Sequence, residues 1–190
     1  MPTQTPQAST DPKTNHFLAR LEQQDYDALM LVGKIVPLKF GKRMQLQDAH
    51  VSAVYFPLTC MFSILVTGDN KPLKELATVG KESIVGAMEV LQAEGAMGLS
   101  LVQIPGTALR NEAAAFLKVI GDRAPVQRLI YQHMYALLRQ VLYGAACNRA
   151  HSMEERCARW LLMTHDRAGQ DSFPLTQEFL SRMRRFVPKL

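Results

Sequence analysis

The chain has 190 residues, of which 47% are hydrophobic and 21% charged, so it is long enough and apolar enough to bury a core in one large or two small domains. It holds three scattered cysteines, Cys60, Cys147 and Cys157, which excludes a disulfide framework and fits a reducing cytoplasm. The positive charge excess lies after residue 120, where ten arginines and one lysine oppose six acidic residues. Guanidinium groups match phosphate geometry, so this excess indicates either a nucleic-acid partner or a solvated helix surface.

The first fifteen residues are rich in Thr, Gln and Pro and contain no apolar run. A signal peptide or a transmembrane helix needs such a run, so neither is expected here. We expect residues 1–15 to form a disordered tail, and we expect a cytoplasmic protein without a membrane partner.

The segment from residue 16 to about 120 begins with a short helix and continues with strands. The helix is predicted before Gly33 from apolar residues at or near helical spacing, namely Phe17, Leu18, Leu21, Tyr26, Leu29 and Met30. Turn formers such as Pro105 and Gly106 then separate four short apolar runs, at 51–56, 60–66, 73–79 and 99–104. This spacing predicts an all-β sandwich or barrel.

A long helix is predicted from Pro125, which suits a first turn, to about Asn148. It carries two adjacent apolar stripes, one of Tyr131, Tyr135, Leu138 and Leu142, the other of Ile130, Met134, Leu137 and Val141. One stripe would cover the β-domain and the other a second copy of the helix, and we assign the Ile130 stripe to the dimer interface. A single broadly buried core helix is the alternative interpretation.

Two further helices are predicted near the end of the chain. Ser152 with Glu155 forms a capping box that starts a helix with an apolar side around Trp160, while its arginines largely project elsewhere. After a break at residues 169–174, Thr176 is an N-cap candidate for the second helix.

Two segments resemble the cyclic-AMP-receptor/fumarate-nitrate (Crp/Fnr) family of bacterial transcription regulators. Residues 79–86, VGKESIVG, resemble the glycine-framed turn that leads into the phosphate-binding cassette of cyclic-nucleotide-binding β-rolls. Residues 147–162, followed by Leu175 to Leu180, resemble the hinge and first helices of a winged helix-turn-helix.

This resemblance implies an α+β fold in three parts. An N-terminal cyclic-nucleotide-binding-like β-roll, a double-stranded β-helix or jelly roll, would occupy residues 16–120 and sense a signal. A long dimerisation helix and hinge would occupy residues 121–150, and a partial winged helix-turn-helix residues 151–190. In the family the paired subunits place recognition helices in the major groove of a two-fold DNA site.

The sequence departs from the family at the expected ligand pocket. In nucleotide-binding members a glutamate at the start of the cassette helix meets the ribose, and an arginine followed by a small hydroxyl residue grips the cyclic phosphate. Here Gly98 and Leu99 stand in place of the arginine and the hydroxyl residue. A buried phosphate would lose its charge-assisted hydrogen bonds, so we do not expect cyclic AMP to bind.

Another small-molecule effector remains a candidate because the residues around the expected pocket are largely apolar, which suits an uncharged ligand. Alternatively these side chains simply fill the roll. The pocket candidates are Gly80, Glu82, Ile84, Gly86, Met88, Leu91, Met97, Gly98 and Leu99. No cysteine cluster precedes Cys60, which excludes the iron-sulfur branch, and we expect neither a metal site nor a cofactor.

The chain stops where the family continues. Pro188 disfavours helix at Val187, so the last residues leave no room for a recognition helix, and we expect a chain truncated inside its helix-turn-helix. The best candidates for phosphate contacts are Arg182, Arg184, Arg185 and Lys189. We therefore interpret the chain as a homodimeric DNA-binding regulator whose own DNA binding is in doubt, with a ligand- or protein-binding sensor and dimerisation module as the alternative. No catalytic motif is present, so an enzyme is not expected.

Overall fold

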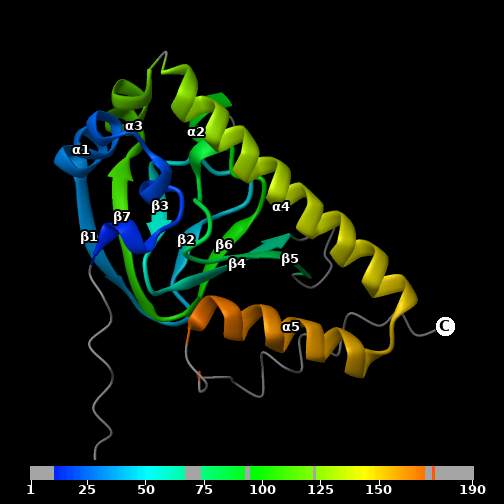
Figure 1. The fold of residues 1–190 in the computed structure, drawn as a ribbon. Helices are drawn as coiled ribbons and strands as arrows, with labels where there is room; N and C mark the ends of the chain where they lie inside the picture. The colour runs from blue at the N-terminus through cyan, green and yellow to red at the C-terminus, as the bar shows by residue number, and fades with distance from the viewer. Residues whose placement is uncertain (1–10, 67–73, 93–94, 122, 170–172, 174–190) are drawn as a thin grey trace, which may run out of the picture.

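The protein is described here from a computed structural model, which places residues 11–66, 74–92, 95–121, 123–169 and 173. Two antiparallel sheets form a β-roll, and helices lie on both sides of it and beneath it in the view of Figure 1. One sheet has the order β1-β7-β3, with β1 at Gly33–Leu38, β7 at Gly106–Glu112 and β3 at Ala53–Pro57. The other has the order β2-β6-β4-β5, with β2 at Arg43–Gln45, β6 at Leu99–Ile104, β4 at Met61–Val66 and β5 at Lys74–Val79.

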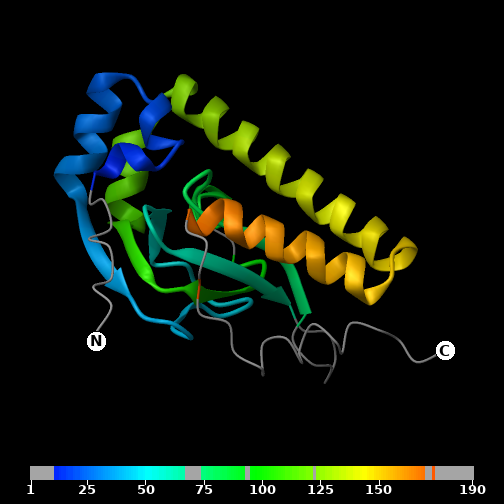
Figure 2. The ribbon, with the colours of Figure 1, turned by 60° about the horizontal axis from the view of Figure 1, so that its bottom comes forward.

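Helices lie at the N-terminal end of the described chain, between β5 and β6, and after β7. They are η1 (Pro12–Thr14), η2 (Leu18–Arg20), α1 (Gln23–Val32), α2 (Ala87–Gln92), α3 (Ala113–Ile120), α4 (Ala124–Ala150) and α5 (Met153–Ala168). The long helix α4 starts beside α3 and runs past the roll, and α5 turns back at its end and returns toward the sheets (Figures 1 and 2). β5 therefore has contacts with both α4 and α5.

The core has two parts. One lies between the N-terminal helices, α3, the start of α4 and the β1-β7-β3 sheet, where the ring of Phe56 packs between those of Phe17 and Phe116 at centroid distances of 5.7 and 6.2 Å. The other lies inside the roll, around Phe62 and Val102. Burying aromatic rings on both faces of β3 explains why all five residues of this strand are buried.

The strands predicted at 51–56, 60–66, 73–79 and 99–104 are confirmed as β3, β4, β5 and β6. β1, β2 and β7 were not predicted, and β1 was missed because Gly33 and Pro37 were interpreted as the end of a helix. Pro37 sits in β1, at the edge of its sheet, where a missing backbone donor is tolerated. The predicted N-terminal helix is present but divided into η2 and α1.

The predicted disordered tail, residues 1–15, is wrong for residues 11–15. Residues 11–15 are folded, and Asn15 is fully buried. Its burial is tolerated because its Nδ2 donates to the carbonyls of Pro57 and Ser83, both at 2.9 Å. Its Oδ1 accepts from the backbone N–H groups of Phe17 and Leu18. One buried amide thus ties the N-terminal segment to the roll, a contact that no local sequence pattern reveals.

The two C-terminal helices that the structure describes follow the prediction. Pro125 lies in the first turn of α4, and the capping box is formed at the start of α5, where the Ser152 hydroxyl accepts from Glu155 N–H and the Glu155 carboxylate accepts from Ser152 N–H. Gly169 ends α5 with a positive φ of 63°. Over the described part of the chain, no helix is long and apolar enough to cross a membrane.

Candidate functional site

The glycine-framed turn connects β5 to the short helix α2. Within it, Val85 and Tyr55 exchange backbone hydrogen bonds, each of 2.9 Å. Gly86 follows with φ +88°, and a Cβ there would stand 2.5 Å from Gln45 Nε2 and 2.8 Å from the Ala53 carbonyl oxygen. Only glycine combines this backbone conformation with so close an approach. The turn therefore requires glycine at Gly86.

The chemistry of a nucleotide-binding cassette is missing from this turn. The helix that follows it begins with Ala87, which is buried, where the family resemblance requires a glutamate. Gly98 precedes β6, and a Cβ on it would lie 2.7 Å from the Leu65 carbonyl oxygen, so the backbone leaves no space for a side chain. The position expected to hold a phosphate-binding arginine is thus closed by the backbone of β4 as well as lacking the cation.

A side chain of β2 occupies the space beside Gly86. The Gln45 carboxamide is buried, accepts a hydrogen bond from the Ser100 hydroxyl at 3.0 Å, and donates to the Ala53 carbonyl at 3.5 Å. Its polar atoms are therefore satisfied by the protein itself. This part of the roll interior is filled by a hydrogen-bonded glutamine and not by open space.

Most of the apolar side chains among the predicted pocket residues belong to the core. Ile84 is buried, and Met88 and Leu91 pack against the same core cluster as Phe56. Leu99 is also buried, whereas Met97 is 58% exposed. The structure brings most of the apolar candidates together as filling of the protein core, which agrees with the alternative interpretation of this segment.

Glu82, the charged pocket candidate, faces α5. Its Oε1 accepts from the backbone N–H of Gly80 at 3.2 Å and from Arg167 Nε at 2.6 Å. Arg167 is largely buried, and its Cβ and Cγ lie against Gly80, where an added Cβ would come within 3.1 and 2.9 Å of them. Arg167 therefore faces the roll as Trp160 does, although the arginines of this helix were expected largely to project elsewhere than its apolar side.

A second carboxylate holds the middle of α5. Trp160 donates its indole N–H to Glu75 Oε1 at 2.8 Å, and burial raises the pKa of Glu75 to about 7. Hydrogen bonds and the charges of Arg167 and Arg159 oppose this shift without cancelling it. Sequence reasoning missed Glu75, although a glutamate in the apolar strand KELATV is the signal that could have found it.

The long helix presents its two stripes differently from the assignment made from the sequence. Ile130 is fully buried in the protein's own core, and Met134 and Leu137 pack against the two core clusters, so this stripe covers the roll. The exposed stripe consists of Tyr131, Tyr135, Leu138 and Leu142, at 53, 65, 54 and 60% exposure. Periodicity identified both stripes but did not distinguish them, because both are apolar.

Val141, the fourth residue assigned to the dimer interface, is half-buried on the same side of α4 as Leu137. The phosphate-contact candidates Arg182, Arg184, Arg185 and Lys189 lie outside the described residues, as does the helix predicted from Thr176. Within the described ranges, no group of three or more His, Cys, Asp or Glu side chains is arranged to hold a metal ion.

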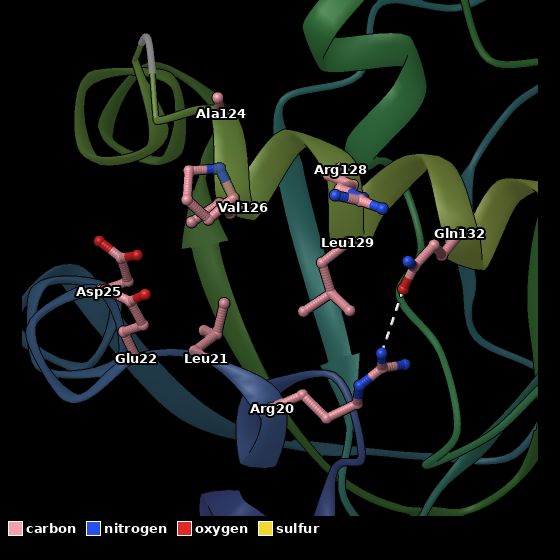
Figure 3. A pocket seen from close by; sticks show the side chains of 10 residues that line it. Arg20, Leu21, Glu22, Asp25, Ala124, Val126, Arg128, Leu129 and Gln132 are labelled. Atoms are coloured by element: carbon pink, nitrogen blue, oxygen red, sulfur yellow. Dashed lines mark hydrogen bonds between the residues drawn. The ribbon is translucent and has the colours of Figure 1, made fainter.

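A pocket of about 450 Å³ lies at the other end of α4, against the η2–α1 segment (Figure 3). Asp25 stands at one end of it and is paired with Arg123, while Arg20 at the other end donates to Gln132 at 3.1 Å. Leu129 lies between them. These polar groups already pair with one another, so the pocket is a junction between the N-terminal segment and α4. The surface formed by the glycine turn and α5 is therefore the better candidate for a functional site.

The sequence matches neither a known protein family nor a curated protein. The fold, in contrast, is similar to solved structures. The c-di-GMP-responsive global regulator CLP of Xanthomonas campestris superposes with a TM-score of 0.68 at 11% identity, over 87% of this chain and 89% of that one. A cyclic nucleotide-binding domain from Methylobacillus flagellatus gives 0.56 at 11% identity, over 73% and 80% of the two chains.

The sensor domain of the transcriptional regulator DNR from Pseudomonas aeruginosa gives a TM-score of 0.53 at 17% identity, over 68% of this chain and 87% of that one. At these identities the likeness concerns the fold. The α+β fold with a cyclic-nucleotide-binding-like β-roll, expected from the sequence, is therefore confirmed.

Proposed function

We propose that this chain is the sensor and pairing part of a cytoplasmic transcription regulator of Crp/Fnr type, acting as a homodimer and not as an enzyme. The observation that carries the proposal is the two-faced helix α4: one face covers a roll of the kind found in CLP and DNR, and the other exposes two tyrosines and two leucines in a row. Such a stripe on a helix of 27 residues suits pairing with an identical helix.

The signal is proposed to be something other than cyclic AMP. Ala87 and Gly98 provide no partner for a ribose or a phosphate, and Gln45 occupies the interior beside Gly86. An effector would therefore act at the surface formed by the glycine turn and α5, or on α4, and not by entering a preformed nucleotide pocket.

DNA contact is proposed to be weak and insensitive to sequence in this chain. The basic residues Arg182, Arg184, Arg185 and Lys189 would contact phosphates, which position a protein without reading bases. The second candidate function, a sensor and dimerisation module without DNA reading, is favoured by one observation. Arg167, a cation of the proposed DNA-binding segment, is turned toward the roll and paired with Glu82.

Sedimentation of a matched pair of variants tests the pairing. Leu138→Lys places a charge on the exposed stripe and is expected to give folded monomers. Leu137→Lys, one position away, places the charge against the protein's own core cluster and is expected to destabilise the fold by about 2–3 kcal/mol. A folded Leu138→Lys variant with the mass of a dimer would remove the exposed stripe from the interface.

A salt series with palindromic and random duplexes tests the DNA contact. The proposal expects binding that falls steeply with salt and is equal for the two duplexes. The Arg184→Gln and Arg185→Gln double variant should flatten that salt dependence. A dimer that binds neither duplex at low salt would instead support the second candidate function.

A further inference from the structure

Helix α5 is held against the roll by two carboxylates from different places in the chain. Glu75 of β5 accepts from Trp160 near the middle of the helix, and Glu82 of the glycine turn accepts from Arg167 near its end. In both views the helix returns along the roll (Figures 1 and 2). The contact between α5 and the roll is therefore polar at these two places, and Trp160 is only 7% exposed.

The surroundings of Glu75 suit a neutral carboxyl group better than a carboxylate. Its Oε1 has the indole donor, but its Oε2 is buried and has no hydrogen-bond partner among the described residues. Ser63 of β4 can lower the pKa of Glu75 through a hydrogen bond, but in the structure its hydroxyl donates to Gln103 Oε1. A buried oxygen without a hydrogen-bond partner is less costly in a neutral carboxyl group than in an ionised one.

The charges around Glu75 come from one element. Arg159 and Arg167 of α5 face it, and arginine does not titrate in the physiological range. Arg167 is engaged with Glu82, and Arg159 Nε is itself buried without a hydrogen-bond partner in the described part of the chain. The long helix α4 contacts β5 nearby through the uncharged Gln140. Glu75 is thus the titratable group that faces Trp160 in this contact.

We propose that Glu75 acts as a proton-operated clamp, which holds α5 on the roll while its carboxyl group is protonated and weakens that hold when the group ionises. The clamp itself needs neither DNA nor a second subunit. Its consequence, that proton loss would free the first helix of the DNA-binding segment, rests on the proposed function.

The direction of the pH effect follows from proton linkage. With α5 docked, the pKa of Glu75 is about 7, and with α5 released the carboxyl group meets water and returns toward its ordinary value of 4.5. Between these values the docked form holds one more proton, so docking weakens by up to about tenfold for each pH unit as the pH rises from 5 to 7. Below 4.5 and above 7 the dependence on this group disappears.

The single tryptophan of the chain reports the clamp directly. Acrylamide quenching of Trp160 fluorescence is measured on the full chain from pH 5 to pH 8.5. The quenching constant is expected to be low at pH 5 and to rise severalfold toward pH 8. A quenching constant that stays flat over this range would overturn the proposal.

Two variants assign the effect. Glu75→Gln keeps the acceptor for Trp160 and cannot ionise, so Trp160 should stay protected at every pH. Glu82→Gln removes the ion pair with Arg167 and should raise quenching at all pH values while leaving the pH dependence in place. A Glu75→Gln protein that follows the wild-type curve would show that another group titrates and would overturn the assignment to Glu75.

Hydrogen exchange of the α5 amides at pH 5.5 and 7.5, corrected for intrinsic rates, provides a second readout on the wild-type chain if Glu75→Gln does not fold. Faster corrected exchange in α5 at pH 7.5, with β4 and β6 unchanged, is expected. Equal rates at both pH values would contradict the clamp. None of these measurements involves DNA, so a chain that fails to bind DNA leaves the clamp open to the same test.

Discussion

The side-chain amide of Gln140 lies flat against the backbone of Thr78. With its oxygen toward the strand N–H, it accepts from Thr78 N at 3.1 Å and from Thr78 Oγ1 at 3.2 Å, and it donates to Thr78 O at 3.2 Å. Thr78 belongs to β5, an edge strand of its sheet, whose other side pairs with β4. The glutamine of α4 thus satisfies edge groups that another strand would otherwise pair with, and it fixes α4 to the roll.

Replacing Gln140 by Ala is expected to lower the free energy of unfolding by about 1–3 kcal/mol, because it leaves the buried backbone groups of Thr78 without partners. Urea denaturation followed by far-UV circular dichroism measures the loss. The matched control is Gln132→Ala on the same helix, whose exposed side chain contacts Arg20 and should cost less than about 0.5 kcal/mol. Equal costs for the two variants would contradict the role of Gln140.

Gly86 and Gly41, the two glycines with the largest positive φ angles among the described residues, should respond differently to a methyl group. Gly86 has φ +88° with atoms of Gln45 and Ala53 within 2.8 Å of the added Cβ, whereas Gly41 has φ +75° and nothing within 4 Å. Gly41→Ala should cost about 1–2 kcal/mol, from backbone strain alone. Gly86→Ala should cost at least about 3 kcal/mol, since the clash with the Ala53 carbonyl adds to the strain. Thermal unfolding of both variants compares them.

Local sequence patterns were enough to predict the helices and strands whose signals are short-range. The four apolar runs, the proline in the first turn of α4 and the capping box at Ser152 all specify their own structure. β7 was missed because its end, Arg110-Asn111-Glu112, looks polar. Its Asn111 is nevertheless fully buried, since its Nδ2 donates to the Leu29 carbonyl 82 residues away at 2.9 Å.

The candidate site could be predicted even less well from the sequence, because it is formed by such long-range contacts. The residues of the glycine turn were found from their resemblance to a family, but the partners of Glu75 and Glu82 lie 85 residues further along the chain in each case. Nothing local to Trp160 or Arg167 says that they face these carboxylates. The same limit applies to α4, where apolar periodicity found both stripes and only the packed structure distinguishes the covered stripe from the free one.

The three cysteines are expected to differ in reactivity. Cys60 is buried, and burial raises the pKa of its thiol to about 12, whereas Cys147 and Cys157 are half-buried. Because the thiolate is the reactive form, iodoacetamide at pH 8 should leave Cys60 unmodified in the native protein. Intact-mass spectrometry should show at most two adducts before unfolding and three in urea. A third adduct on the native chain would place Cys60 in contact with solvent.

Cyclic AMP at millimolar concentration should raise the melting temperature by less than about 1 °C. A ligand present at a hundred times its dissociation constant would stabilise the fold by about 2.7 kcal/mol, which in a chain of this size is a shift of several degrees.

Introducing the missing cation should not create a cyclic-AMP site. Gly98→Arg must place its Cβ 2.7 Å from the Leu65 carbonyl, so this variant should unfold at a lower temperature and remain insensitive to the nucleotide. Gly98→Ala, which carries the same clash without the charge, is the control and should lose a comparable amount of stability. A shift of several degrees with cyclic AMP, in the wild type or in Gly98→Arg, would mean that the roll opens near Gly98 and that Gln45 leaves its place beside Gly86.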